Sequence, residues 1–271
     1  MLIKSYLDLL KILPKSNCKE CGLDSCLLFA LKVFSKEISP RACPYLPLES
    51  VPKELLTSNL TFNQLLENLK YLKEKFKALD LREMAENLGA FYDKATHTLS
   101  LFYLDTEILI SLEEEGHPLD LKDLKGKELD PRDEILLCNY FLFKGRSPLT
   151  GNFVGLEAFP HSISKVKTLK IYAEDPLSEI LSQPNIDKKL LFKEFKITQF
   201  KEEQGNLSIT IFALPKVPLM INFWAGDLED QLLPSCKILY DASAINYLDL
   251  ECLVFLAERL TEKLRDYVSR T

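Results

Sequence analysis

The feature that most constrains how this chain can fold is a group of four cysteines near its start. Their spacing is C-x2-C-x4-C-x16-C, so three thiols fall within nine residues and the fourth comes directly before a proline. Clustered cysteines pair as disulfides in secreted proteins and bind metals in intracellular ones. The first residues, MLIKSYLDLLKILPK, carry charges inside their apolar run and do not match a signal peptide. We therefore expect metal ligation by Cys18, Cys21, Cys26 and Cys43.

The spacing of these cysteines suits an iron–sulfur cluster, and we expect one [4Fe–4S] cluster. Three closely spaced thiolates can surround one corner of a cubane, and the fourth returns after a helix to close it. Gly22 lets the backbone turn tightly near the sulfides. Amides at the start of the following helix can donate hydrogen bonds to cluster sulfur. Pro44 gives the Cys-Pro ending that is typical of bacterial ferredoxin runs.

Structural zinc is the main alternative for a set of four cysteines. Zinc sites of this type usually contain two C-x2-C pairs. This chain has one such pair, Cys18 and Cys21, and a predicted helix separates Cys26 from Cys43. The spacing therefore favours iron–sulfur over zinc. A third interpretation, four buried cysteines without a ligand, does not explain why they are clustered.

The residues around the cysteines also resemble a known domain. The matching stretches are Leu13–Gly22, Cys26–Ala30 and Cys43–Leu46. They closely resemble the [4Fe–4S] domain of the large subunit of the corrinoid iron–sulfur protein, and a similar domain occurs in the B subunit of the Rnf electron-transport complex. The resemblance implies that the four cysteines hold one [4Fe–4S] cluster that transfers single electrons. It ends with the module, because the chain is too short for a corrinoid-binding barrel and has no second cysteine-rich motif.

Beyond this module, the sequence predicts a linker and a larger mixed domain. Residues 1–50 form the cluster-binding module, and the prolines near its end predict a linker over residues 51–60. Residues 61–271 combine helical and alternating periodicity, which predicts an α+β fold with an antiparallel sheet and flanking helices. We expect helices over residues 3–10, 24–35, 61–79, 81–88, 131–143, 173–182 and 250–268, strands over 98–103, 107–112, 192–201, 207–212, 219–224 and 238–240, and a loop over 145–161.

Several motifs in the second domain are shared with another family. They lie at residues 139–141, 148–151, 222–227, 240–241 and 247–248. Through them the domain is similar to a family of prokaryotic proteins that is classed as a domain of unknown function and is often found behind this iron–sulfur module. Phe153 departs from that pattern, where a tryptophan is expected, and so does the segment 228–234. The resemblance implies no activity.

Acidic residues at strand ends are the main candidates for chemistry in the second domain. Asp227, Glu229 and Asp230 follow a predicted strand and could bind a cation or a basic partner. A solvated acidic turn at Gly226 is the simpler interpretation. Asp241 follows another strand, where a carboxylate usually caps the next turn.

Other candidates have simple structural interpretations. The loop at residues 148–152 could contact a ligand, although a plain turn explains its composition. The three histidines, His97, His117 and His161, lack the spacing of a metal pair and are expected at the surface or as caps. Cys138 and Cys252 lie on apolar helix faces and should be buried thiols. Cys236 is expected to be half-exposed, without a histidine to activate it.

Composition narrows the classes of function. The net charge of −6 and pI near 5.3 argue against nucleic-acid binding and against attraction to anionic membranes. The longest apolar run, residues 135–143, is far below the roughly 20 residues that span a bilayer. We therefore expect a cytoplasmic protein without a membrane span. The sequence does not define the oligomeric state.

Our leading hypothesis is a one-electron transfer or redox accessory protein with a redox protein partner. Corrinoid or one-carbon metabolism is the setting that the resemblance implies. The chain lacks the G-x-G-x-x-G, Walker, H-E-x-x-H and G-x-S-x-G motifs, which makes an enzyme less expected without excluding one. Two alternatives stay open: a scaffold protein stapled by a structural cluster, and an enzyme that acts through Asp227, Glu229 or Asp241.

Overall fold

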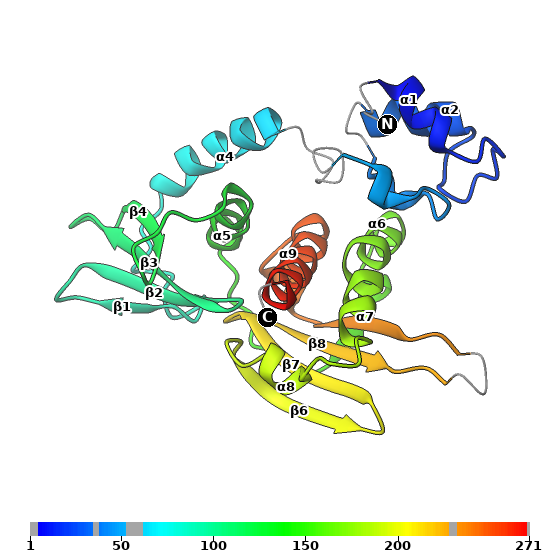
Figure 1. Cartoon of the computed structure of the whole chain (residues 1–271). Helices are drawn as coiled ribbons and strands as arrows, with labels where there is room; N and C mark the ends of the chain where they lie inside the picture. Colours follow the sequence, from blue (N-terminus) through cyan, green and yellow to red (C-terminus); the bar gives the residue numbers. More distant parts are fainter. Residues whose placement is uncertain (1–4, 35–37, 53–61, 228–231, 270–271) are drawn as a thin grey trace. The chain divides into compact units, whose positions relative to one another are not determined.

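The computed structural model describes residues 5–34, 38–52, 62–227 and 232–269. The chain forms two compact units, Met1–Asn68 and Leu69–Thr271, and each is described here by itself. In Figure 1 the first unit runs from blue into the first turns drawn in cyan, and the mixed second unit takes the remaining colours. The predicted linker over residues 51–60 lies mostly outside the described residues.

The first unit is a small helical module with its own apolar core. Helix α1 (Tyr6–Ile12) begins where the Ser5 hydroxyl accepts a hydrogen bond from the Asp8 amide. It ends two residues later than predicted, and the first part of the predicted helix lies outside the described residues. Helix α2 (Cys26–Phe34) follows the cysteine loop. The short 3-10 helices η1 (Pro40–Ala42) and η2 (Leu48–Ser50) complete the described module. The apolar core consists of Leu9, Leu13, Cys26, Phe29, Ala30, Val33, Ala42, Cys43, Leu46 and Val51.

Helix α4 (Phe62–Lys77) ends two residues before its predicted end. Leu69, Leu72 and Phe76 recur at helical spacing and are buried, as expected for one face of an amphipathic helix. The Phe76 ring lies 5.5 Å from the ring of Phe141, centroid to centroid. This aromatic contact anchors the last turns of α4 in the second unit.

A segment predicted as a helix, residues 81–88, forms a series of turns instead. Its start is held by other contacts: the Leu81 amide donates to the Gly116 carbonyl, and the Asp80 carboxylate accepts from the Arg82 amide. At its end the Gly89 and Ala90 amides donate to the Glu86 and Ala85 carbonyls, three and five residues back, instead of making the four-residue bonds of an α-helix. Gly89 ends the segment with φ +65°, in the left-handed conformation expected for a glycine stop.

The first sheet of the second unit has four antiparallel strands in the order β1-β2-β3-β4. Strand β2 has its predicted bounds, and β3 begins one residue early. The two outer strands were not predicted, because their short sequences contain charged or turn-forming residues. The strands are β1 (Phe91–Asp93), β2 (Thr98–Tyr103), β3 (Thr106–Leu112) and β4 (Pro118–Asp123).

The second sheet has five antiparallel strands in the order β5-β9-β8-β7-β6. Strand β5 lies inside the segment predicted as a loop, residues 145–161, and pairs with the end of β9. The sheet's buried face carries Leu219, Ile221 and Phe223 of β8, which alternate with more exposed residues. The strands are β5 (Phe153–Gly155), β6 (Ile197–Glu203), β7 (Asn206–Leu214), β8 (Val217–Trp224) and β9 (Ser235–Asp241).

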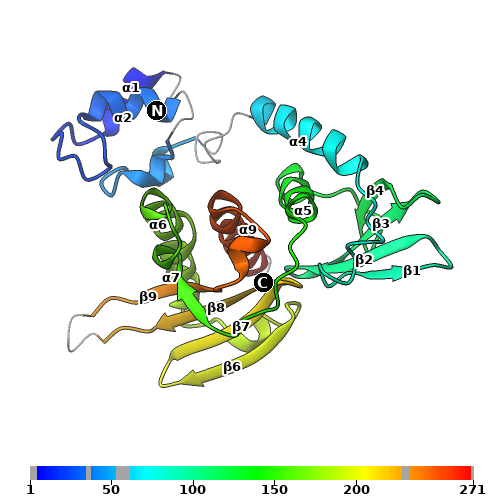
Figure 2. The same cartoon turned by 180° about the vertical axis from the view of Figure 1, so that it is seen from behind.

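Helices cover one face of the five-stranded sheet, as Figures 1 and 2 show from opposite sides. The predicted helix over residues 173–182 is the second half of a longer helical stretch. Its middle turn is a π-helix, just before Pro176, which cannot donate a hydrogen bond to the preceding turn. The helical elements are η3 (Leu156–Ala158), α6 (Ile163–Leu169), η4 (Lys170–Glu174), α7 (Asp175–Leu181), α8 (Lys188–Leu191), η5 (Ala244–Asn246) and α9 (Leu250–Val268).

The prediction of a strand over residues 192–201 was wrong in its first half. Asp187 caps α8 by accepting a hydrogen bond from the Leu190 amide. The buried rings of Phe192 and Phe195 lie 5.7 Å apart, a contact between residues three apart that suits a turn and not a strand. The strand begins only at Ile197.

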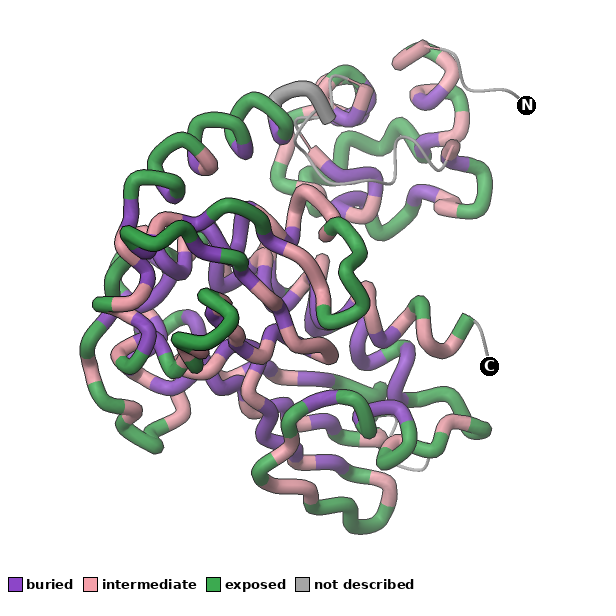
Figure 3. The backbone as a smooth tube through the Cα atoms, turned by 90° about the vertical axis from the view of Figure 1, so that its left-hand side faces the viewer, coloured by how far each residue is buried: buried purple, intermediate pink, exposed green. Residues whose placement is uncertain are grey.

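The predicted α+β class is confirmed, with two antiparallel sheets where one was expected. Helix α5 (Pro131–Phe143) has its predicted bounds and begins at Asp130, which accepts a hydrogen bond from the Arg132 amide. The Leu104 amide of the four-stranded sheet's β2–β3 turn donates to the Ala213 carbonyl of β7. Figure 3 shows buried residues, in purple, where the helices meet the strands. None of the helices in the described ranges combines the length and apolar character needed to cross a bilayer.

Candidate iron–sulfur site

The loop that carries the first two cysteines has an unusual backbone. Lys15, Asn17 and Lys19 all have positive φ angles, of 56°, 50° and 64°, and Gly22 follows at 81°. The left-handed conformation costs roughly 1–2 kcal/mol for a residue with a side chain. The Gly22 amide closes the loop with a 2.8 Å hydrogen bond to the Lys19 carbonyl. Such concentrated strain is typical of a loop shaped to hold a ligand.

One side chain joins this loop to the helix that carries the third cysteine. The Asn17 Oδ1 atom accepts a 2.8 Å hydrogen bond from the backbone amide of Cys26. The Ser25 hydroxyl accepts another from the Leu28 amide, so Ser25 caps α2. The Asn17 side chain therefore fixes the position of Cys26, the first residue of α2, relative to Cys18.

The fourth cysteine reaches the same region on a separate short helix. Ser39 caps η1 by accepting from the Arg41 amide, and the Cys43 amide donates to the Pro40 carbonyl. Two residues further on, the Tyr45 hydroxyl donates a 2.9 Å hydrogen bond to Glu20, which lies between Cys18 and Cys21. This bond brings the Cys43 segment beside the cysteine loop.

The four thiols differ in exposure and influence one another. Cys18 is exposed and Cys21 is half-buried, whereas Cys26 and Cys43 are 8% and 7% exposed. Burial raises the pKa of Cys43, and the charges of Cys21, Cys26 and Cys18, when ionised, raise it further, while the Tyr45 amide opposes them. The Cys43 thiolate would therefore be repelled by the other three thiolates, and a cationic metal centre would offset this repulsion.

The donor set fits an iron–sulfur group, although the side chains do not converge on one point. Within the described ranges, no group of three or more His, Cys, Asp or Glu residues is placed to hold a metal ion. What fits a cluster is a set of four thiols from two segments, joined by the Asn17 and Glu20 hydrogen bonds. The assignment of Cys18, Cys21, Cys26 and Cys43 as ligands stays a prediction.

Asp241 was considered as a catalytic acid, but the structure gives it a structural role. Its carboxylate is fully buried and accepts hydrogen bonds from the amides of Thr150, Gly151 and Ser243 and from the hydroxyls of Thr150 and Ser243. Burial raises its pKa, but these hydrogen bonds outweigh burial, so the pKa lies below its ordinary value. Asp241 therefore caps the following turn, as expected, and also anchors the loop at residues 148–152.

The acidic residues that follow β8 do not form a site within the described residues. Asp227 is exposed, and its backbone exchanges two hydrogen bonds with the backbone of Leu232. Gly226 has φ +78°, and a Cβ atom there would lie 2.4 Å from the Leu232 carbonyl oxygen, so the turn requires glycine. Glu229 and Asp230 lie outside the described residues.

The three histidines are not part of any metal-holding group within the described residues. His97 is exposed beside Tyr92, and His117 contacts the Leu79 carbonyl through Nδ1 at 3.1 Å. His161 is exposed with φ 62°. These positions agree with the surface and capping roles expected of them.

The remaining cysteines are buried thiols. Cys138 and Cys252 are buried, as predicted, whereas Cys236 is 8% exposed and the expectation that it would be half-exposed was wrong. It lies on β9 opposite Phe223 of β8. Burial raises the pKa of all three thiols, and that of Cys138 to about 12, so they stay protonated at neutral pH.

A buried ionic network was not predicted from the sequence. The Asp133 carboxylate accepts hydrogen bonds from the Tyr103 hydroxyl at 2.6 Å and from the Arg259 guanidinium at 2.8 and 2.9 Å. Arg132 binds Asp130 and Glu262 beside it. These residues join β2, α5 and α9. Bonded partners are up to 130 residues apart, so no local sequence pattern indicates the network.

Comparison with protein families identifies both parts of the chain. A family model described as "Domain of unknown function (DUF3786)" matches residues 80–263, about two thirds of the chain. A second model, described as "Putative Fe-S cluster", matches residues 13–45, the segment that contains all four clustered cysteines. The resemblances noted from the sequence are thus confirmed, and the N-terminal segment is an iron–sulfur type of domain. No solved structure matches this chain.

Several curated proteins share a short segment with this chain. The acetyl-CoA decarbonylase/synthase complex subunit gamma of Methanocaldococcus jannaschii is 50% identical over 42 residues, which cover 16% of this chain and 9% of that protein. The corrinoid/iron-sulfur protein large subunit of Moorella thermoacetica is 49% identical over 39 residues, which cover 14% and 9%. The chain thus spans about a tenth of the length of these relatives.

Proposed function

This chain belongs to the DUF3786 domain family, and we propose that it is a [4Fe–4S] protein whose cluster carries single electrons to or from a protein partner. Cys18, Cys21, Cys26 and Cys43 would be the four ligands. Residues 1–50 would form the cluster-binding module and residues 61–271 a separate domain that docks a partner or ligand. The match of the iron–sulfur family model to residues 13–45 is the observation that carries this proposal.

The geometry of the loop supports four-cysteine ligation. Positive φ angles at Lys15, Asn17 and Lys19 in one short loop are typical of a backbone shaped around a ligand. The Asn17 and Tyr45 hydrogen bonds hold the three cysteine-bearing segments together. The bound cluster would supply one-electron redox chemistry, and the protein would set its potential through burial and hydrogen bonds to sulfur.

The exposure of the thiols supports electron transfer to a protein. Cys18 is exposed, while Cys26 and Cys43 are buried. A cluster on these ligands would have one corner near solvent, where a partner could approach. Leu27 and Tyr45 are also 45% and 52% exposed, and each lies within two residues of a proposed ligand. Partly exposed apolar side chains beside a redox centre suit a transient protein contact.

The setting of this electron transfer is proposed from the relatives. One is named as a subunit of an acetyl-CoA decarbonylase/synthase complex and another as a corrinoid/iron-sulfur protein subunit. We therefore propose that the partner belongs to corrinoid or one-carbon metabolism, in the cytoplasm. The matched segments cover about a tenth of those relatives, so the proposal extends to their cluster domain and not to their other activities.

The test is anaerobic purification of the full chain with analysis of iron, sulfide and zinc. We expect a brown protein with about four irons and about four sulfides per chain and a spectrum that bleaches on reduction. The Cys26→Ala variant should lose the four-ligand site, whereas Cys252→Ala, a matched change of a buried cysteine in α9, should keep it. Bound zinc without iron, or an intact cluster in Cys26→Ala, would contradict the proposal.

A second candidate is a scaffold protein in which the cluster is purely structural. The small size of the module's core favours it, because a unit of about fifty residues gains little stability from apolar burial alone. Redox titration separates the two functions. Reversible reduction at potentials that biological donors reach supports electron transfer, and a cluster that stays in one oxidation state supports the scaffold.

A further inference from the structure

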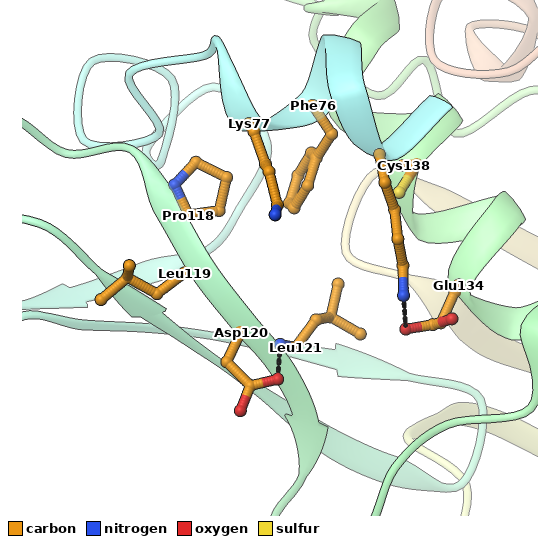
Figure 4. Close-up of a pocket in the computed structure, with 9 residues that line it drawn as sticks. Phe76, Lys77, Pro118, Leu119, Asp120, Leu121, Glu134 and Cys138 are labelled. Carbon is orange, nitrogen blue, oxygen red and sulfur yellow. Dashed lines mark hydrogen bonds and ion pairs between the residues drawn. The ribbon is translucent and has the colours of Figure 1, made fainter. Parts of the chain in front are cut away.

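A pocket in the second unit lies away from the cysteines and is not used by the proposed function. It has a volume of about 140 Å3 and is enclosed by the last turns of α4, strand β4 and helix α5. Figure 4 shows the Lys77 side chain pointing from α4 across the pocket toward Leu121 and Asp120. The pocket therefore has a cation at one side and β4 at the other.

The inner walls of the pocket are apolar. Phe76, Leu121 and Cys138 line it, and all three are buried, while Pro118 and Leu119 form its outer side. Burial raises the pKa of Cys138 to about 12, so its thiol is uncharged at neutral pH and acts as an apolar surface. A hydrocarbon group could lie against these side chains without leaving a polar group unpaired.

The charges around the pocket leave one cation uncompensated. Lys73 pairs with Glu134 at 2.7 Å, and Asp120 pairs with Lys122 at 2.6 Å. Each of these pairs is neutral overall. Lys77 pairs with no acid in the part of the chain that the structure describes. The pocket thus offers a single positive charge beside an apolar surface.

We propose that this pocket binds a small monocarboxylate of about six carbon atoms in all. The carboxylate would lie on the Lys77 ammonium and the hydrocarbon against Phe76, Leu121 and Cys138. The volume sets the size, because a cavity of about 150 Å3 is large enough for benzene. The single unpaired cation sets the charge, since a dianion would leave one negative charge against Glu134 and Asp120.

The test is titration of the full-length anaerobic holoprotein with hexanoate, followed by 1H–15N NMR. We expect saturable shifts at the amides of Leu121 and Cys138 with a Kd of about millimolar, which is normal for so small a ligand. The neutral probe 1-hexanol should bind about tenfold more weakly, because it lacks the charge-assisted hydrogen bond to lysine. Added salt should also weaken hexanoate binding, since Lys77 is exposed.

Two variants on the same helix complete the test. Lys77→Gln should weaken hexanoate binding about tenfold and leave hexanol binding unchanged. Lys75→Gln is the matched control, because Lys75 lies over the Tyr71 ring and does not line the pocket. Equal binding of hexanoate and hexanol, no shifts at Leu121 and Cys138, or an equal effect of the two variants would overturn the proposal.

Discussion

At the scale of single residues, Asp241 shows how a carboxylate that looked catalytic holds the fold together. Five hydrogen-bond donors from two loops converge on its buried oxygens. Two of the matched family motifs, residues 148–151 and 240–241, meet in this one cluster. The physical reason for the motifs is therefore the closure of the loop that leads into β5.

We predict that Asp241→Asn destabilises the chain by about 1–3 kcal/mol, because an amide cannot accept from all of these donors and some become buried and unpaired. Equilibrium unfolding in urea measures the change. Ser243→Ala removes one donor group and should cost less, at most about 1 kcal/mol. Equal stability of Asp241→Asn and the unmodified chain would show that the carboxylate is not a structural anchor.

We predict a larger loss of stability when the buried Asp133–Arg259 ion pair is broken. Both groups are buried, and the Tyr103 hydroxyl also donates to Asp133. Arg259→Met leaves a buried carboxylate without its cation and should destabilise the protein by about 3–5 kcal/mol. Tyr103→Phe removes a single hydrogen bond and should cost about 1 kcal/mol. Thermal or urea unfolding compares the two variants, and a smaller loss in Arg259→Met than in Tyr103→Phe contradicts this ranking.

Residues predicted from the sequence are those whose role is local. Gly226 was expected to form a turn, because the signal for a glycine turn lies within a few residues of its effect. Asp241 was expected to cap the next turn, but its bonds to Thr150, 91 residues away, left no trace in the pattern. The ligand role of the four cysteines is also a local prediction and awaits iron analysis.

At the scale of elements, the junction between the cysteine loop and α2 depends on one side chain. The Asn17 Oδ1 atom accepts from the Cys26 amide, the first residue of the helix. We predict that Asn17→Ala destabilises the module by about 1 kcal/mol and speeds the loss of iron to a chelator, because the loop is no longer tied to the helix. The conservative variant Asn17→Asp keeps an acceptor and should lose iron at close to the original rate. Equal rates in all three proteins would refute this role.

Helices and strands were predicted best where their ends carry a chemical signal. Helix α5 begins at the pair Asp130–Pro131 and α9 at Asp249, whose carboxylate accepts from the Cys252 amide, and both match their predicted bounds. Strand β5 was missed because three residues give too short a pattern and pairing with β9 defines it. The segment 192–195 has strand-forming residues, yet tertiary packing of two phenylalanines makes it a turn.

At the scale of the whole molecule, the stability should depend on pH through Glu258. Burial, and next the charge of Glu262, raise the pKa of this carboxyl group to about 8, so it is protonated in the folded state at neutral pH. Its ordinary value is 4.5, so the folded state binds a proton more tightly than the unfolded state. The stability that this proton provides is complete below about pH 4 and is lost as the pH rises through about 8.

We therefore predict that Glu258→Gln, which cannot ionise, becomes more stable relative to the unmodified chain as the pH rises from 5 to 9. Urea unfolding at several pH values measures the difference. Glu251→Gln is the matched control, because Glu251 is exposed on the same helix. A constant difference between Glu258→Gln and the unmodified chain across this range would show that Glu258 titrates normally.

The two compact units lead to a final prediction about how the whole chain unfolds. The first unit has one small core, and two of its buried members are the proposed ligands Cys26 and Cys43. Removing a cluster would leave their thiols without a partner and release the strained loop, so the module should unfold when an anaerobic chelator takes the iron. The second unit has its own core of two sheets and α9 and should stay folded.

Hydrogen exchange should then show lost protection in α1 and α2 and unchanged protection in β8 and α9. Protection that survives in α1 and α2 would mean that apolar packing alone holds the module, and loss in α9 would mean that the units do not unfold independently.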